Sequence, residues 1–148
     1  MSQQALKSLT VLLRASQSIE EVLRKDMQKY GLNMTEFAVL ELLYHKGEQP
    51  IQKIGEKILI TSGSITYVVD KLEKKGFVER VACPNDRRVT FATITESGKT
   101  FMNQIFPQHE QKVAQIFDVL NDDEQQQFIE MAKTIGFHAK SLTALKTI

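Results

Sequence analysis

The spacing of apolar residues changes at Gly76, and this change limits the possible folds more than any other feature of the chain. After Gly76, "FVERVA" and "RRVTFATI" alternate as β-strands do, and the turn sequence "CPND" separates them. Before Gly76, apolar residues recur at helical spacing, as in Ile65, Val68, Val69 and Leu72. The sequence therefore predicts a helix that leads directly into a two-stranded hairpin.

Two further helices are predicted immediately before this one, with turns of only a few residues between them. Residues 33–47 carry one apolar stripe and end at Gly47, and Pro50 begins a short helix. The third helix covers residues 61–76, with Thr61 or Ser62 available as the N-cap. Short tandem helices followed by a hairpin form a winged helix-turn-helix. The predicted fold class is therefore mainly α, with a small β-hairpin wing.

Long apolar helices are predicted on both sides of this unit. One covers residues 4–29 and closes at Gly31. Another begins after Thr95, which can cap it, and continues to about residue 119. A last helix starts at Asn121, where Glu124 is placed for a capping box. These helices have more apolar surface than one small winged domain can cover, which favours a two-fold interface between two copies. We expect one domain over 1–148: a DNA-binding part over 33–94, with a recognition helix at about 61–75 and a wing at about 77–94, and dimerisation helices over 1–30 and 95–148.

Composition excludes several classes of protein. The 148 residues are 42% apolar and 25% charged, as in ordinary globular domains, and no apolar run is long enough to span a bilayer. The N-terminal residues lack the layout of a signal peptide, so we expect a cytoplasmic protein. The net charge of +1 is unevenly distributed: residues 46–94 carry nine basic and six acidic side chains, whereas residues 95–148 carry five and seven. The basic middle segment is compatible with a nucleic-acid partner.

Two groups of residues are candidates for contact with DNA. Arg87 and Arg88 lie at the predicted tip of the hairpin, where the planar guanidinium group suits a narrow minor groove. The polar face of the predicted third helix has hydroxyl and ammonium groups for bases and phosphates, and small residues that permit close approach. An ordinary solvated helix face has a similar composition, but the helix-turn-helix context favours DNA contact. The candidates on this helix are Ser62, Gly63, Ser64, Thr66, Tyr67 and Lys71.

The segment "GSITYVVDKLEKKGFVERVACPNDRRVTFATITESGKTF" (63–101) resembles the signature region of MarR-type transcriptional regulators. The resemblance extends in layout over nearly the whole chain. Residues 44–76 are also similar to the subgroup of repressors that respond to catechols and quinones. The matched positions are Leu72, Glu73 and Gly76 in the helix; Val78 and Arg80 in the first strand; Asp86 and Arg88 at the wing tip; and Ile94, Thr95 and Gly98 after it.

The resemblance implies a homodimeric repressor that binds double-stranded DNA at a palindromic operator. It also implies that Asp86 pairs with an arginine and orients it at the wing tip. Family members typically have a cavity for a small aromatic or phenolic effector between the winged and helical parts. Aromatic and leucine residues at helical spacing are usually plain core, so both interpretations stay open for the candidate lining residues, which are Leu12, Ser16, Phe37, Tyr44 and Phe101.

Other functions have less support. Cys83 is the single cysteine, which excludes an internal disulfide, and it is either a regulatory redox thiol or an incidental residue of the wing. A winged helix can also be a protein-interaction module without DNA binding, although such a module would more often carry an apolar face. The three histidines are dispersed and no catalytic motif occurs, so we expect no metal site, no cofactor and no enzymatic activity.

Overall fold

The structure is a computed structural model that describes residues 2–58 and 64–144. The chain forms two compact units, Met1–Lys112 and Val113–Ile148, which are described separately. The described residues of the first unit contain α1 (Ser2–Gln28), α2 (Met34–Lys46), β1 (Gln49–Pro50), α3 (Ile51–Lys57), α4 (Ile65–Lys74), β2 (Val78–Ala82), β3 (Thr90–Ile94) and most of α5 (Glu96–Phe117). The second unit contains the last residues of α5 and α6 (Asp122–Ala144).

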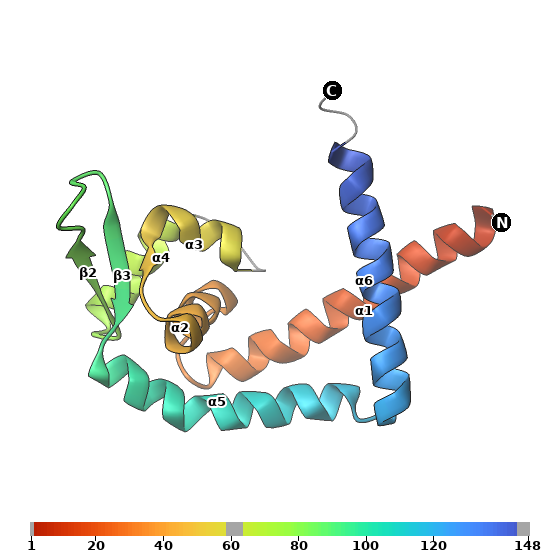
Figure 1. Ribbon diagram of the computed structural model, residues 1–148. Coiled ribbons are helices and arrows are strands. Elements are labelled where there is room, and N and C mark those ends of the chain that lie inside the picture. Colours follow the sequence, from red (N-terminus) through yellow and green to blue (C-terminus); the bar gives the residue numbers. More distant parts are fainter. Residues whose placement is uncertain (1, 59–63, 145–148) are drawn as a thin grey trace. The chain divides into compact units, whose positions relative to one another are not determined.

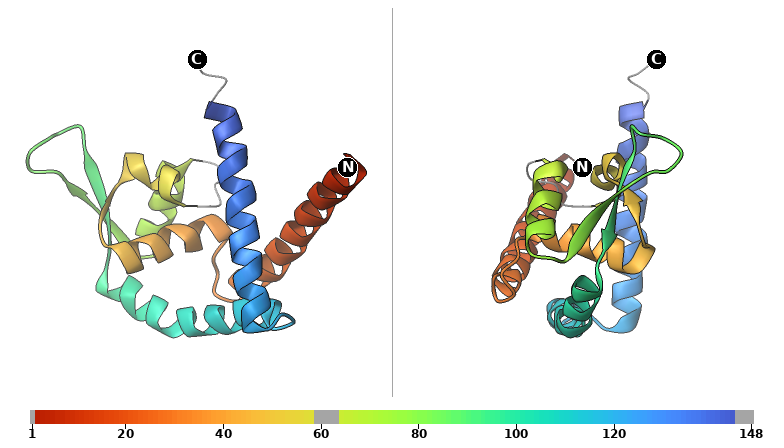
Figure 2. Two further views of the ribbon diagram at one scale, coloured as in Figure 1. Left: turned by 45° about the vertical axis from the view of Figure 1, so that its right-hand side comes forward. Right: turned by 90° about the vertical axis from the view of Figure 1, so that its left-hand side faces the viewer.

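Helix α2 lies at the centre of the first unit, with α5 on one side and α3 and α4 on the other (Figures 1 and 2). The helix is apolar on most of its circumference, because Val39 and Leu40 are completely buried and Phe37 almost so. Helix α4 covers one side of this core with a narrower apolar stripe: Val68, Val69 and Leu72 are buried. The opposite face of α4 is therefore left for solvent or a partner.

The wing consists of β2, β3 and the turn between them, residues 83–89, and projects beyond α3 and α4 (Figure 2). The two strands pair antiparallel, with Val78 opposite Ile94 and Ala82 opposite Thr90. The two residues of β1 add a third strand to the free edge of β3, giving the order β1-β3-β2. Pro50 is tolerated there because an edge strand does not need every backbone N–H.

The segment before α4 differs from the sequence prediction. The helix begins at Ile65 with Ser64 at the N-cap position, and the Ser64 side chain makes no capping hydrogen bond. The expected start and the expected caps, Thr61 or Ser62, lie outside the described residues. The strand β1 was not predicted either, because two residues are too few to show an alternating pattern.

Two predicted ends of helices are confirmed in detail. Thr95 caps α5: its Oγ1 accepts a hydrogen bond from Gly98 N at 3.0 Å and donates to the carbonyl of Gly76 at 2.6 Å. In the second unit Asn121 and Glu124 form the expected capping box, with reciprocal backbone-to-side-chain bonds of 2.9 Å. Each cap satisfies backbone N–H groups that the first turn of the helix leaves without partners.

Gly98 brings α5 against the start of the wing. A Cβ atom at this position would collide with the carbonyl oxygen of Phe77 and would lie 2.7 Å from Cγ1 of Ile94. The missing side chain also lets Phe101, one turn later, stack on Phe77 with ring centroids 4.4 Å apart. The glycine of the "TESG" sequence therefore fixes the distance between the wing and α5.

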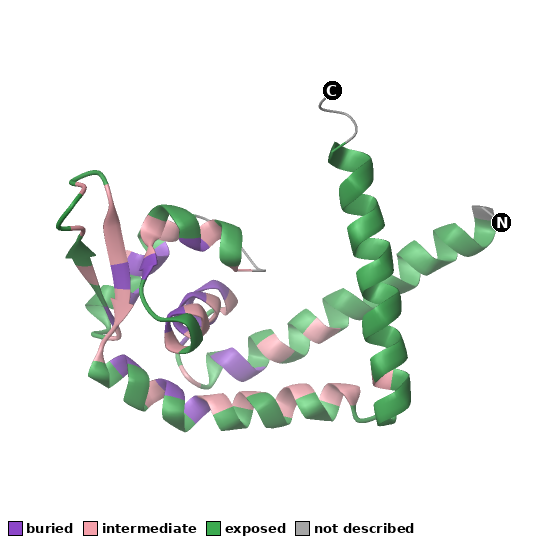
Figure 3. Cartoon of the chain, viewed as in Figure 1, coloured by how far each residue is buried: buried purple, intermediate pink, exposed green. Residues whose placement is uncertain are grey.

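Helix α6 has no buried residue within the second unit (Figure 3). Its apolar side chains include Phe128, Ile129, Met131, Ile135, Phe137 and Leu142, all exposed by 41% or more. The N-terminal half of α1, in the first unit, is similarly exposed, with Leu6, Leu9, Leu12 and Leu13 in contact with solvent. Both helices therefore have apolar surface that this single chain does not cover.

Candidate nucleic-acid interface

The polar face of α4 is the first part of the candidate interface. Thr66, Tyr67 and Lys71 are exposed on it, and Ser64 is exposed at its start. The Tyr67 side chain is 60% exposed, and Lys71 Nζ lies 5.3 Å from the centroid of its ring. This cation–π contact holds an ammonium group beside an exposed phenol. Of the predicted helix residues, Ser62 and Gly63 lie outside the described part of the chain.

Arg80 connects the wing to α4. Its guanidinium lies 2.6 Å from Asp70 Oδ1 and 2.8 Å from Glu73 Oε1, and Nη2 also donates to the carbonyl of Thr66 at 3.2 Å. Both acidic side chains of α4 are therefore paired within the molecule. The polar face of α4 consequently presents hydroxyl and ammonium groups beside two carboxylates whose charge Arg80 partly offsets.

Asp86 and Arg88 form a compact polar turn at the tip of the wing. Asp86 Oδ1 accepts hydrogen bonds from the backbone N–H of Arg88 at 3.0 Å and from its Nε at 3.2 Å. The Arg88 side chain nevertheless remains 90% exposed, and Arg87 is exposed beside it. The turn is also attached to α3, because Gln52 Nε2 donates to the carbonyl of Arg88 at 3.0 Å.

These contacts lower the pKa of the Asp86 carboxyl below its ordinary value. The backbone N–H of Arg88 is the larger cause, and the hydrogen bond from the Arg88 side chain adds to it. The lowered pKa keeps Asp86 ionised at neutral pH, as an acceptor for the hydrogen bonds from Arg88.

Cys83 lies in the wing as a free, half-buried thiol. Its backbone N–H donates to the carbonyl of Val89 at 3.0 Å, which closes the base of the turn. This bond involves only the backbone and gives the thiol no chemical role.

The five predicted effector residues do not come together at one place. Leu12 and Ser16 are exposed on α1. Tyr44 donates a hydrogen bond to Asn103, and Phe101 is stacked on Phe77. Phe37 alone lines a groove of about 370 Å³ between α1, α2, α5 and the end of α3.

His109 of α5 lines this groove beside Phe37, with ring centroids 4.6 Å apart. Its Nδ1 is buried and makes no hydrogen bond to any described residue. Glu41 and His45 of α2 also line the groove. Sequence patterns did not point to His109, because a single histidine on a long helix has no distinguishing spacing. In the described part of the chain, no three His, Cys, Asp or Glu residues are placed to hold a metal ion.

Arg80 and Gln52 were also absent from the predicted set of site residues. Arg80 was visible in the sequence as part of the strand pattern after Gly76, but its partners on α4 were not. Gln52 carries no sequence signal, because its contact is with a backbone carbonyl 36 residues away.

The arrangement of α2, α3, α4 and the wing defines a winged helix-turn-helix protein. A family model, described as the MarR family, matches residues 32–90. The HTH-type transcriptional regulator MhqR of Bacillus subtilis (strain 168) is 54% identical over 140 residues, covering 95% of this chain and 97% of its own length. The chain therefore belongs to the MarR family of transcriptional regulators.

Solved structures of this family share the fold. AbsC, a MarR family transcriptional regulator from Streptomyces coelicolor, gives a TM-score of 0.85 at 22% identity, over 95% of this chain and 97% of that one. Sco3205 from the same organism, solved in complex with DNA, gives 0.82 at 24% identity, over 92% and 87%. Within the described residues, no helix is both long and apolar enough to cross a membrane.

Proposed function

We propose that this protein is a cytoplasmic, homodimeric repressor that binds a pseudo-palindromic operator and is released from it by a small aromatic effector. Helix α4 enters the major groove, where Ser64, Thr66, Tyr67 and Lys71 contact bases and phosphates. The undescribed Ser62 and Gly63 belong to the same proposed contact. Arg87 and Arg88 approach the adjacent minor groove, with Asp86 orienting Arg88.

One observation carries this proposal: α4 and the tip of the wing expose their cations, while the nearby Asp70, Glu73 and Asp86 are bonded to arginines of this chain. Arg80 pairs with Asp70 and Glu73 and offsets part of their charge, and Asp86 bonds Arg88 without covering it. An exposed surface that retains free ammonium and guanidinium groups suits the phosphate backbone. A relative of the same fold, Sco3205, was solved in complex with DNA, which supports the assignment.

Most residues of α1 and α6 are exposed (Figure 3), and the apolar ones among them support the homodimer. A second copy would cover them, because a soluble protein rarely leaves so much apolar surface in contact with water. Two copies of α4 about 34 Å apart would contact successive major grooves on one side of the duplex. An operator with two-fold symmetry follows from this arrangement.

The groove beside Phe37 and His109 is the effector site that we propose. Its apolar lining suits an aromatic ring, and the unpaired Nδ1 of His109 suits a phenolic hydroxyl group. Because residues 44–76 are similar to the subgroup that responds to catechols, catechol is the first compound to test. His109→Phe should preserve DNA binding and raise the catechol concentration needed for release at least tenfold.

Cys83→Ser tests the alternative of a redox switch. This variant should respond to catechol as the wild-type protein does, and loss of the response would support a regulatory thiol instead.

Selection of bound sequences from a random DNA pool tests the central proposal. A two-fold symmetric consensus is the expected result, and a pool without enrichment would contradict sequence-specific binding.

A second experiment tests the wing. The affinities of Arg87→Ala and Arg88→Ala for the consensus and for random DNA are measured over a series of salt concentrations. Each lost phosphate contact should reduce the slope of log affinity against log salt by about 1. An unchanged affinity and slope in both variants would exclude the wing from the interface.

A further inference from the structure

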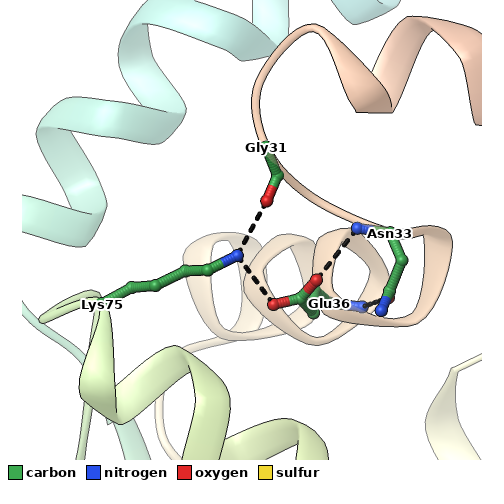
Figure 4. A network of polar contacts seen from close by, with 4 residues as sticks. All are labelled: Gly31, Asn33, Glu36 and Lys75. Carbon is green, nitrogen blue, oxygen red and sulfur yellow. Dashed lines mark hydrogen bonds and ion pairs between the residues drawn. The ribbon is translucent and has the colours of Figure 1, made fainter.

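A network of four residues joins the end of α4 to the turn between α1 and α2 (Figure 4). Lys75 Nζ donates to the carbonyl of Gly31 at 2.8 Å and to Glu36 Oε2 at 2.9 Å. The other carboxylate oxygen, Oε1, accepts a hydrogen bond from Asn33 N at 3.0 Å. Asn33 Oδ1 in turn accepts from Glu36 N at 2.8 Å. The network therefore connects three helices through one carboxylate and one ammonium group.

Glu36 could cap α2 without any contribution from Lys75. The capping box needs only Asn33 and one oxygen of Glu36. The Glu36 side chain is nevertheless only 4% exposed, and its second oxygen is directed at Lys75. Burying an ionised carboxylate without a partner costs free energy of folding. The attraction between Glu36 and Lys75 therefore holds the Lys75 side chain in place.

Gly31 places the second acceptor of the network. Its φ of 74° lies in the left-handed region, which lets the chain reverse direction after α1. The carbonyl at this reversal accepts the bond from Lys75. One ammonium group is thus bonded both to the turn that follows α1 and to the start of α2.

Lys75 is the C-cap residue of α4, at the opposite end from Thr66 and Tyr67. Helix α4 has ten residues and is therefore about 15 Å long. A rotation of about 10° around its attached end would displace the other end by almost 3 Å, close to the rise of about 3.4 Å per base pair. Fixing this end of α4 consequently determines where its exposed face lies relative to α1.

We propose that Lys75 is a positioning residue that determines which half-site spacing the dimer accepts. This inference rests on the proposed function, in which α1 contributes to the dimer and two copies of α4 contact one operator. With the network intact, each α4 keeps a fixed orientation relative to the α1–α2 turn. Without it, α4 remains packed through Val68, Val69 and Leu72 but tilts more freely.

The test compares operators whose two half-sites are one base pair closer together or further apart than in the selected consensus. The wild-type protein should bind the consensus spacing at least tenfold more tightly than the altered spacings. The double variant Lys75→Met/Glu36→Gln removes both charges and retains an amide oxygen for the capping bond to Asn33. In the double variant, the ratio of the affinity for the consensus spacing to the affinity for the altered spacings (the spacing ratio) should fall at least threefold.

Lys74→Met is the matched control. Lys74 is the neighbouring lysine, is exposed, and makes none of the bonds of the network. Its loss removes the same charge and should leave the spacing ratio unchanged, even if affinity for all DNA falls. Lys75→Arg, which keeps a cation at the position, should retain most of the ratio.

The single variant Glu36→Gln covers the case in which the double variant does not fold, because it removes the buried charge and keeps the cap. A lower melting temperature alone does not support the proposal, since lost stability would weaken all operators equally. Folded variants that keep the full ratio would overturn the positioning role. Absence of any spacing preference in the wild-type protein would instead overturn the proposed dimeric DNA binding.

Discussion

Arg80 of β2 and Asp70 of α4 form an ion pair with Nη2 and Oδ1 2.6 Å apart. Glu73 completes the arrangement on the same helix. The guanidinium therefore attaches the wing to α4 and offsets negative charge that, in the proposed complex, would face a phosphate backbone. Structural attachment and electrostatic compatibility with DNA depend on the same side chain.

Replacing Arg80 by methionine tests this double role. Asp70 and Glu73 would be left unpaired near the DNA, and we expect operator affinity to fall at least tenfold. The free energy of unfolding should fall by only about 1 kcal/mol, because the carboxylates are partly exposed. Operator titration and chemical denaturation measure the two effects.

The additional changes Asp70→Asn and Glu73→Gln separate charge from attachment. If repulsion is the main cause of the lost affinity, they should restore most of it in the Arg80→Met background. Equal affinity of Arg80→Met and the wild-type protein would show that the carboxylates lie away from the DNA.

The Asp86–Arg88 pair predicts a specific titration of the wing tip. The pKa of Asp86 is lowered in the folded protein, so its contribution to stability is present above the unfolded value of 3.8 and is lost as the pH falls through the lower folded value. An NMR titration of the Asp86 carboxyl carbon should give a midpoint below 3.8. Arg88→Ala should raise this midpoint only part of the way, because the backbone N–H of residue 88 is the larger cause. A return of the midpoint to 3.8 in this variant would show that the side chain alone lowers the pKa.

Local signals predicted most of the fold. The glycines at 31, 47 and 76 correctly marked the ends of helices, and each has a positive φ. Thr95 and Asn121 were correctly identified as helix caps, because the chemistry of a cap depends on residues three positions apart. The order of helices and strands followed from these signals and from the apolar periods.

Long-range contacts could not be predicted in the same way. The ion pairs of Arg80 span seven to ten positions, and the bond from Lys75 to Glu36 spans 39. The packing of the helices determines which of these side chains meet, and local sequence patterns do not show that packing. The same reason explains the effector groove: the family resemblance proposed Phe37, but His109 is brought beside it only by the packing of α5 on α2.

Gly98→Ala should destabilise the fold strongly. The added Cβ would collide with the carbonyl of Phe77 and press on Ile94, so α5 or the wing would have to move. We expect a loss of about 2–3 kcal/mol in the free energy of unfolding. Gly55→Ala is the control, since its Cβ would meet only Ile65 Cγ1 at 3.6 Å and alanine favours the helix. Similar stabilities of the two variants would mean that the Phe77–Gly98 contact is easily relaxed.

The exposed apolar helices predict a dimer that single charges can break. Leu9 of α1 is 54% exposed and Phe137 of α6 is 70% exposed in the single chain. Complete burial of such a side chain contributes about 1.5–3 kcal/mol, so Leu9→Glu or Phe137→Glu should raise the dimer dissociation constant by about tenfold or more. Sedimentation equilibrium measures this constant.

Val81→Glu is the control: it places the same charge on an exposed apolar residue of the wing and should leave association unchanged. If both helix variants associate as tightly as the wild-type protein, the dimer interface lies on another surface. Operator binding that persists in a monomeric variant would show that one copy of α4 and the wing is sufficient.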